Sequence, residues 1–235
     1  MKLEKIVKWL DEVLQSNKFD DVSNNGLQIE NSGIDIARVA FAVDASLQSV
    51  RAACEQGAQM LVVHHGISWG GGIKRITGGE YNVIGEAIRS RLALYASHLP
   101  LDANKKVGNN WQLARFMGLK NISPAFSYHG NIIGVTGISP KKRTVEIGEI
   151  KFTIPKGKIG VCSGGAAVFA KDAASSGCKV LVTGEADWGE TIAAENIGME
   201  MILAGHYLTE TFGVKALAKL LEKTYPEIET IFISR

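Results

Sequence analysis

Hydrophobic residues recur with a helical period at the start of the chain. The apolar positions lie three or four residues apart, which predicts an amphipathic helix ending near residue 16. These positions are Leu3, Ile6, Val7, Leu10, Val13 and Leu14. A polar segment with the turn-forming run Ser23-Asn24-Asn25-Gly26 follows, and it predicts a loop before the first strand.

After the loop, short apolar runs alternate with amphipathic ones. We expect strands over residues 38–44, 60–64 and 92–96, and helices over residues 46–56, 81–90 and 109–117. Such alternation predicts crossover units on a parallel or mixed sheet, with helices on both faces.

A middle stretch, residues 129–154, is rich in Val, Ile, Thr and Gly and predicts antiparallel strands with a hairpin. The alternation then returns, with strands expected over residues 159–162, 180–183, 199–204 and 227–233 and helices over residues 166–175, 190–196 and 209–222. The sequence therefore predicts an α/β protein of two similar α/β halves with mixed sheets. The halves are expected at residues 1–125 and 126–235, interlocked in one structural unit.

The two halves also resemble each other residue by residue. When AACEQGAQMLVVHHGISW is placed above DAASSGCKVLVTGEADW, Gly57 matches Gly177 and the pair His64-His65 falls opposite Gly184-Glu185. With a loop over roughly residues 70–80 present only in the first copy, His98-x-x-x-Asp102 falls opposite His206-x-x-x-Glu210. Hydrophobic periodicity does not require polar residues to coincide at strand ends. The coincidence favours an internal repeat over a chance similarity among α/β units.

Two adjacent histidines, His64 and His65, directly follow the apolar run that starts at Met60. Neighbouring side chains of a strand point to opposite faces, so both imidazoles share one site only if the strand ends there. Gly66 permits that ending. Two buried imidazoles need two sets of partners or lose their solvation, and metal binding explains the pair better than a core position does.

Further polar residues lie at or just after the ends of predicted strands, where open α/β sheets bind their ligands. In the second half we expect His206 in a turn, Thr209 as a helix N-cap, and Glu210 one turn on, facing the same cavity as the histidine. His129 is expected to be a solvated loop residue. The candidate ligands are His64, His65, His98, Asp102, His206 and Glu210.

The donor types restrict the metal. Imidazole nitrogen and carboxylate oxygen without thiolate suit Zn²⁺, Fe²⁺, Mn²⁺ or Ni²⁺ rather than an iron–sulfur cluster. One catalytic zinc needs about three protein ligands and an open position. The candidate ligands outnumber those that one zinc ion needs, whereas two ions sharing a bridging carboxylate would use them all.

Composition narrows the class of protein. A hydrophobic content of 46% in 235 residues supports an ordinary soluble core. Lys and Arg number 26 against 24 Asp and Glu, and with no basic run longer than Lys141-Lys142-Arg143 this argues against nucleic-acid binding. Three cysteines outside any C-x-x-C pair indicate a reducing compartment, the cytoplasm. No segment has the roughly 20 apolar residues of a membrane span.

A glycine-rich run, Cys162-Ser163-Gly164-Gly165, lies between a predicted strand and a predicted helix. Its backbone N–H groups could bind a phosphate-like anion. The run lacks the lysine of a P-loop, and a plain tight turn explains it equally well.

Several motifs together resemble the Nif-three-like family, often labelled GTP cyclohydrolase I type 2. The resemblance implies a dinuclear metal centre in a cleft between the two halves, in subunits that assemble from dimers into a toroidal homohexamer. The chain is similar to short members, which lack an inserted middle domain. The motifs are NNGLQ at residues 24–28, VVHHG at 62–66, H-x-P-x-D at 98–102, TGE at 183–185 and GHY-x-TE at 205–210.

The resemblance also implies roles for individual residues. His65 and Asp102 would hold one metal, His64 and His206 the other, and Glu210 would bridge the two. His98 and Glu185 are then candidates for proton transfer. After TGE, relatives commonly carry another histidine a few residues on, whereas this chain has Ala186-Asp187-Trp188, so no accessory role is assigned there.

The favoured function is a dinuclear metal-dependent hydrolase with a small-molecule substrate. Its reaction would be cyclohydrolase-like action on a nucleotide, or cleavage of a related cyclic amide or a phosphoester. The alternative is a non-enzymatic metal-binding or scaffold protein acting in storage, sensing or partner recruitment. A third hypothesis is a nucleotide-binding α/β domain with incidental histidines. It predicts no bound metal.

Overall fold

The computed structural model describes residues 1–235, which form two compact units. Unit 1 comprises Met1–Leu101 and Val214–Arg235, and unit 2 comprises Asp102–Gly213. The sequence places the division at residue 125 instead. The difference arises because the last strand, β12 (Glu229–Phe232), pairs with β2 (Arg38–Asp44), so the C-terminal segment belongs to unit 1.

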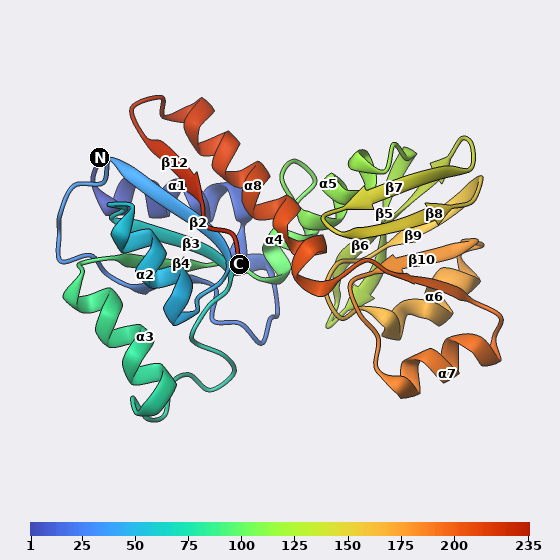
Figure 1. Cartoon of the computed structure of the whole chain (residues 1–235), viewed down its shortest axis with the longest axis horizontal. Helices are drawn as coiled ribbons and strands as arrows, with labels where there is room; N and C mark the ends of the chain where they lie inside the picture. The colour runs from blue at the N-terminus through green and yellow to red at the C-terminus, as the bar shows by residue number, and fades with distance from the viewer. The chain divides into compact units, whose positions relative to one another are not determined.

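Unit 1 is built on a five-stranded sheet of order β1-β4-β3-β2-β12 (Figure 1). β3 spans Met60–His65 and β4 spans Ala93–Ala96, and both run parallel to β2 and β12. β1 (Gly26–Ile29) is antiparallel to β4, at an edge that the sequence predicts as loop. The unit also contains α1 (Leu3–Leu14), a short 3-10 helix (Ser16–Lys18), α2 (Leu47–Glu55) and α3 (Gly78–Arg89).

The core of unit 1 follows the alternation of its strands. Leu61 and Val63 of β3 pack in one cluster with Val50 of α2 and Ala87 of α3. Because strand side chains alternate, Met60 and Val62, which are also fully buried, belong to the other face. The buried apolar run therefore carries β3 through the middle of the sheet to its two terminal histidines.

Unit 2 is built on a second five-stranded sheet, of order β11-β10-β9-β6-β5. β9, β10 and β11 are parallel, and β6 and β5 continue the sheet in antiparallel fashion. The hairpin β7–β8 confirms the predicted middle hairpin. The strands are β5 (Lys120–Tyr128), β6 (Asn131–Ser139), β7 (Arg143–Ile147), β8 (Ile150–Ile154), β9 (Gly157–Val161), β10 (Val180–Thr183) and β11 (Glu200–Leu203).

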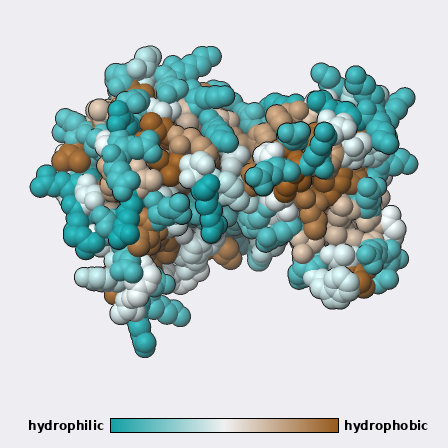
Figure 2. All heavy atoms as spheres, in the orientation of Figure 1, coloured by the Kyte–Doolittle hydropathy of each residue, from teal (hydrophilic) through white to brown (hydrophobic).

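The helices of unit 2 are α5 (Asn109–Phe116), a 3-10 turn (Ala167–Phe169), α6 (Ala170–Ser175) and α7 (Trp188–Asn196). α4 (Leu99–Ala103) and α8 (His206–Thr224) contain the two points where the chain passes from one unit to the other. None of the helices combines the length and the apolar character that crossing a membrane requires. Hydrophilic side chains cover much of the face drawn in Figure 2.

The predicted internal repeat is visible in the backbone. The parallel strands β2, β3 and β4 of unit 1 match β9, β10 and β11 of unit 2 in order and direction. Gly57 and Gly177 both have left-handed backbones, with φ of +72° and +75°. The residue after each glycine donates its N–H to a carbonyl five residues earlier, at 3.0 Å in both copies. The two halves thus share a helix-ending turn that a non-glycine residue would strain.

Candidate metal centre

The strand β3 ends at His65, one residue beyond the expected end at His64. Gly66 allows this by its size, because a Cβ there would lie 2.6 Å from the Cβ of Ala96 and would also overlap the side chain of Gln28. The backbone of Gly66 does not need a positive φ. The ring centroids of His64 and His65 lie 4.6 Å apart, so the strand end brings both imidazoles to one place.

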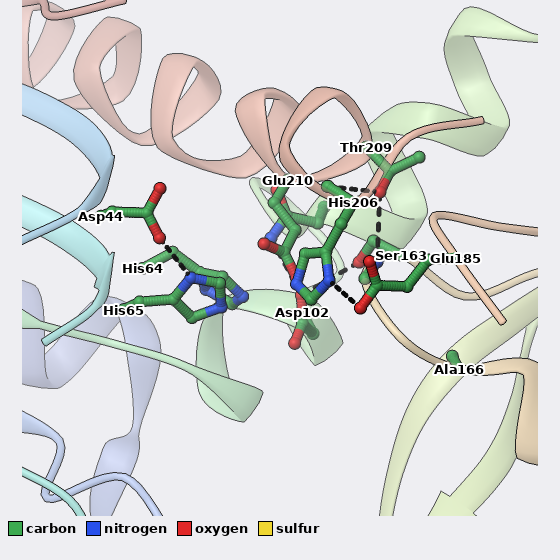
Figure 3. Close-up of polar contacts among 12 residues, drawn as sticks. Asp44, His64, His65, Asp102, Ser163, Ala166, Glu185, His206, Thr209 and Glu210 are labelled. Carbon is green, nitrogen blue, oxygen red and sulfur yellow. Dashed lines mark hydrogen bonds and ion pairs between the residues drawn. The ribbon is translucent and has the colours of Figure 1, made fainter. Parts of the chain in front are cut away.

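The Nδ1 atoms of both histidines face hydrogen-bond acceptors. His64 is fully buried, and its Nδ1 lies 3.0 Å from the carbonyl oxygen of Ser97. His65 Nδ1 lies 2.8 Å from a carboxylate oxygen of Asp44 (Figure 3). Neither acceptor can donate a hydrogen, so Nδ1 carries it, and Nε2 of the neutral ring bears the lone pair. Metal-ligating histidines are commonly oriented in this way.

His98 is fixed in unit 1 by a polar network. Its Nδ1 lies 2.9 Å from Asp21 Oδ1, and its backbone N–H donates to Asn25 Oδ1 at 2.7 Å. The Asp21 side chain is only 1% exposed and also accepts from Asn25 Nδ2 and from the N–H groups of Ser23 and Leu99. Burial raises the pKa of Asp21, but hydrogen bonds from His98, Asn25 and Ser23 outweigh it and lower this pKa to about 2. Asp21 therefore stays a carboxylate that orients His98.

In unit 2, His206 is the first residue of α8 and Glu210 lies one turn later. His206 Nε2 is 3.1 Å from Glu210 Oε1, as expected for side chains at i and i+4. His206 Nδ1 is 2.9 Å from Glu185 Oε1 (Figure 3). The predicted pairing of His206 with Glu210 on one face is therefore correct.

The predicted N-cap role of Thr209 is wrong. Thr209 lies inside the first turn of α8, where its hydroxyl donates to the carbonyl of His206 at 2.9 Å. The same oxygen accepts the N–H of Gly164 at 3.1 Å. The helix begins three residues earlier than expected because Gly205, with φ of +85°, turns the chain directly from the sheet into α8.

The charge state of His206 follows from its carboxylate neighbours. The hydrogen bond to Glu210 is the largest influence and raises the pKa of His206, burial lowers it, and Glu185 raises it further, to about 9. At neutral pH the metal-free ring is thus an imidazolium. A metal ion at Nε2 has to displace that proton.

Asp102 is buried in unit 2 at 6% exposure. Its Oδ1 accepts from Asn109 Nδ2 at 2.9 Å and from the Ser163 hydroxyl at 3.2 Å. Asn109 is itself held by the N–H of Gly213, which donates to its Oδ1 at 2.6 Å. The carboxylate is therefore oriented by two neutral donors.

The glycine-rich run before α6 behaves as a tight turn. The N–H groups of Ser163, Gly164 and Ala166 donate to side-chain oxygens of Asn110, Thr209 and Thr183, so these groups do not form an anion cradle. A Cβ on Gly164 would overlap Glu210 Oε1 and lie 3.3 Å from His206 Nε2. The glycine thus keeps space beside these two side chains.

Sequence reasoning missed the residues that orient the ligand candidates. Asp44 ends β2, the strand beside β3, so its position at a strand end could have revealed it. Asp21 lies in a polar loop with no periodic signal. Of the two predicted proton-transfer residues, His98 lies with the unit 1 histidines and Glu185 contacts His206. Their catalytic roles stay predictions.

Comparison with known proteins gives consistent results over the whole chain. A family model described as Duf34/NIF3 (NGG1p interacting factor 3) matches residues 1–235. The chain is 39% identical to a "GTP cyclohydrolase 1 type 2 homolog" of Deinococcus radiodurans, covering 94% of this chain and 89% of that protein. It is 37% identical to a protein of the same name from Pyrococcus abyssi, over 99% and 98%. The crystal structure of TTHA1606 from Thermus thermophilus is 30% identical and matches with a TM-score of 0.79, covering 100% of this chain and 98% of that one.

Proposed function

This chain belongs to the Duf34/NIF3 family, and on that premise we propose that it is a metal-dependent hydrolase of a small nucleotide-like molecule. Two divalent ions would be held by five side chains. His65 and Asp102 would bind one ion, His64 and His206 the other, and Glu210 would bridge the two. The motif resemblance provides this division of ligands.

One observation carries the proposal: His64 and His65 are oriented by different acceptors. Ser97 follows β4 and Asp44 ends β2, which are the strands on either side of β3. Each Nδ1 is thus paired with its own neighbour, which leaves Nε2 of each neutral ring as the atom that would bind an ion. The assignment of the two rings to separate ions comes from the motif resemblance.

The donor chemistry fits such ions. The five side chains offer nitrogen and oxygen, which suits Zn²⁺, Fe²⁺, Mn²⁺ or Ni²⁺. Cys162 is buried nearby in unit 2, and burial together with the charges of Asp102 and Glu210 raises the pKa of its thiol well above the usual value. The thiol therefore stays protonated and does not compete as a thiolate ligand.

When bound, two such ions would lower the pKa of a water toward neutrality and polarise the bond to be hydrolysed. The water would lose one proton as its oxygen bonds to the electrophilic atom, and the leaving group would take up a proton as its own bond breaks. We assign that proton transfer to His98, because the ionised Asp21 orients its ring. Glu185 contacts His206 and is assigned as its orienting partner, with proton transfer as its alternative role.

A metal and product assay tests the proposal. Protein reconstituted with Zn²⁺, Mn²⁺ or Fe²⁺ is incubated with purine nucleotides, cyclic amides and phosphoesters, and mass spectrometry identifies products that have gained water. We expect turnover that Glu210→Gln abolishes and that Glu195→Gln, on an exposed glutamate of α7, leaves unchanged. Bound metal without any product would favour the metal-binding or scaffold alternative. Failure to bind metal would contradict both hypotheses.

The family resemblance further predicts a toroidal hexamer built from dimers. We propose this assembly for the chain. Light scattering of the purified protein measures its mass directly, and a monomeric mass would contradict the proposal.

A further inference from the structure

We propose that unit 1 binds a divalent metal ion by itself, on three imidazole nitrogens from His64, His65 and His98. The family pattern divides the first two histidines between two ions and leaves the third out. The geometry of unit 1 groups all three. One ring nitrogen of each residue lies within 4.8 Å of one ring nitrogen of each of the others.

The rings form a compact triangle. Their centroids are separated by 4.6 Å for His64 and His65, 5.1 Å for His64 and His98, and 5.7 Å for His65 and His98. Tetrahedral zinc with bonds of about 2.0–2.1 Å places its ligand nitrogens about 3.4 Å apart. The three nitrogens lie within 4.8 Å of one another and would move closer together on binding one ion.

All three rings present the same kind of donor. The Nδ1 atoms of His64, His65 and His98 face the Ser97 carbonyl, Asp44 and Asp21 at 2.8–3.0 Å. Because each acceptor lacks a hydrogen to donate, Nε2 bears the lone pair in every neutral ring. Three imidazoles with an open fourth position form a known zinc arrangement, and two of the three have the carboxylate partner typical of such ligands.

A purely structural cluster explains these contacts less well. His64 is fully buried, and packing imidazoles against one another in a core requires only that their polar atoms are satisfied. Here acceptors on three different segments hold the Nδ1 atoms, and one ring nitrogen of each histidine lies within 4.8 Å of one ring nitrogen of each of the others. Trp69 borders the group, with its ring 5.2 Å from His98 and its Nε1 donating to the Gly66 carbonyl at 2.9 Å.

The chemistry selects the ion. A set of three neutral nitrogens suits Zn²⁺ or Co²⁺ and does not suit Mg²⁺ or Ca²⁺, which prefer oxygen. The inference rests on the proposed function only for the expectation that the protein binds a divalent metal. It deepens that function by naming the site that takes the first ion. His98 is then a ligand in the singly loaded protein, and it is the proton-transfer residue once both ions are bound by the five-residue set.

A cobalt titration tests the three-nitrogen site. In the double variant Asp102→Asn/Glu210→Gln, which lacks the two buried unit 2 carboxylates, we expect one equivalent of Co²⁺ to bind. Proton NMR should show three exchangeable, paramagnetically shifted imidazole N–H signals, one from each Nδ1–H. Adding His98→Gln should remove one signal and weaken Co²⁺ binding by more than the roughly 10-fold that loss of an orienting partner alone costs at the low end. Adding His129→Gln, on an exposed loop histidine, should change neither.

Two results would overturn the inference. One is an unchanged Co²⁺ affinity and signal count after His98→Gln. The other is a double variant that binds no Co²⁺ although its circular dichroism and unfolding midpoint match those of the wild type. Failure of the proposed function would give a different result. A protein that hydrolyses none of the tested molecules, or that never binds a second ion, would still show the three N–H signals that come from its first ion.

Discussion

His65 and Asp44 end two neighbouring parallel strands, and their side chains meet with Nδ1 2.8 Å from Oδ1. β2 and β3 are paired so that these two residues lie in register. The sheet itself therefore sets the direction of the His65 ring. An orienting carboxylate of this kind fixes the tautomer and raises the basicity of a metal ligand.

Replacing Asp44 should therefore weaken metal binding without removing a ligand. We expect Asp44→Ala to lower the affinity for Zn²⁺ by about 10- to 100-fold, measured by competition with a chelating dye. Asp172→Asn, on an exposed aspartate of α6, is the matched control and should bind as the wild type does. Equal affinities in the two variants would show that Asp44 does not orient a ligand.

The tight fit around Gly66 gives a prediction about stability. Gly66→Ala places a methyl group against Ala96 and Gln28, and such overpacking typically costs about 1–3 kcal/mol in the free energy of unfolding. Gly71→Ala is the control, because Gly71 has open space around its Cα and no positive φ. Urea denaturation measures both variants. If Gly66→Ala were as stable as Gly71→Ala, the end of β3 would accommodate the added methyl group without loss of stability.

The fold was largely predictable from the sequence where buried strands produce strong patterns. β2 and β10 match the expected ranges at both ends, since each is an apolar run bounded by polar residues. β5 was missed altogether, since no strand is expected over residues 120–128. It lies at a sheet edge, with most of its residues exposed and Pro124 inside it. An edge strand that buries little has no clear alternation to detect.

The places of the candidate ligand residues in the fold were predictable, but the contacts that orient their side chains were not. The candidates lie at or just after strand ends, and His98 and Asp102 match His206 and Glu210 in the repeat, which a sequence shows. Asp44 contacts His65 only because β2 pairs with β3, and Thr209 contacts Gly164 across 45 residues of chain. Such contacts depend on strand order and tertiary packing, which periodicity does not specify.

Single histidine substitutions test the two-ion assignment. With metal in excess, His64→Ala and His65→Ala should each lose about one ion per chain, and the ions lost should differ. Loading the protein first with Co²⁺ and then with Zn²⁺, and recording the visible spectrum of each variant, distinguishes the two sites. If both variants lost the same ion and kept no second one, the two-ion assignment would fail, while the three-nitrogen site of unit 1 would stand.

His206 predicts how the stability of the metal-free protein depends on pH. Its pKa is about 9 in the folded chain, against an ordinary value of 6.5. Because the folded state holds the proton more tightly, the ion pairs of His206 with Glu210 and Glu185 stabilise the fold fully below about pH 6.5. This contribution is lost as the pH rises through about 9.

In chelator-treated protein the free energy of unfolding should therefore fall between about pH 6.5 and 9 more steeply for the wild type than for His206→Asn. Since His206 is partly exposed, the difference should shrink in high salt. Parallel pH profiles for the two proteins would show that His206 is not held as an imidazolium by its carboxylate neighbours.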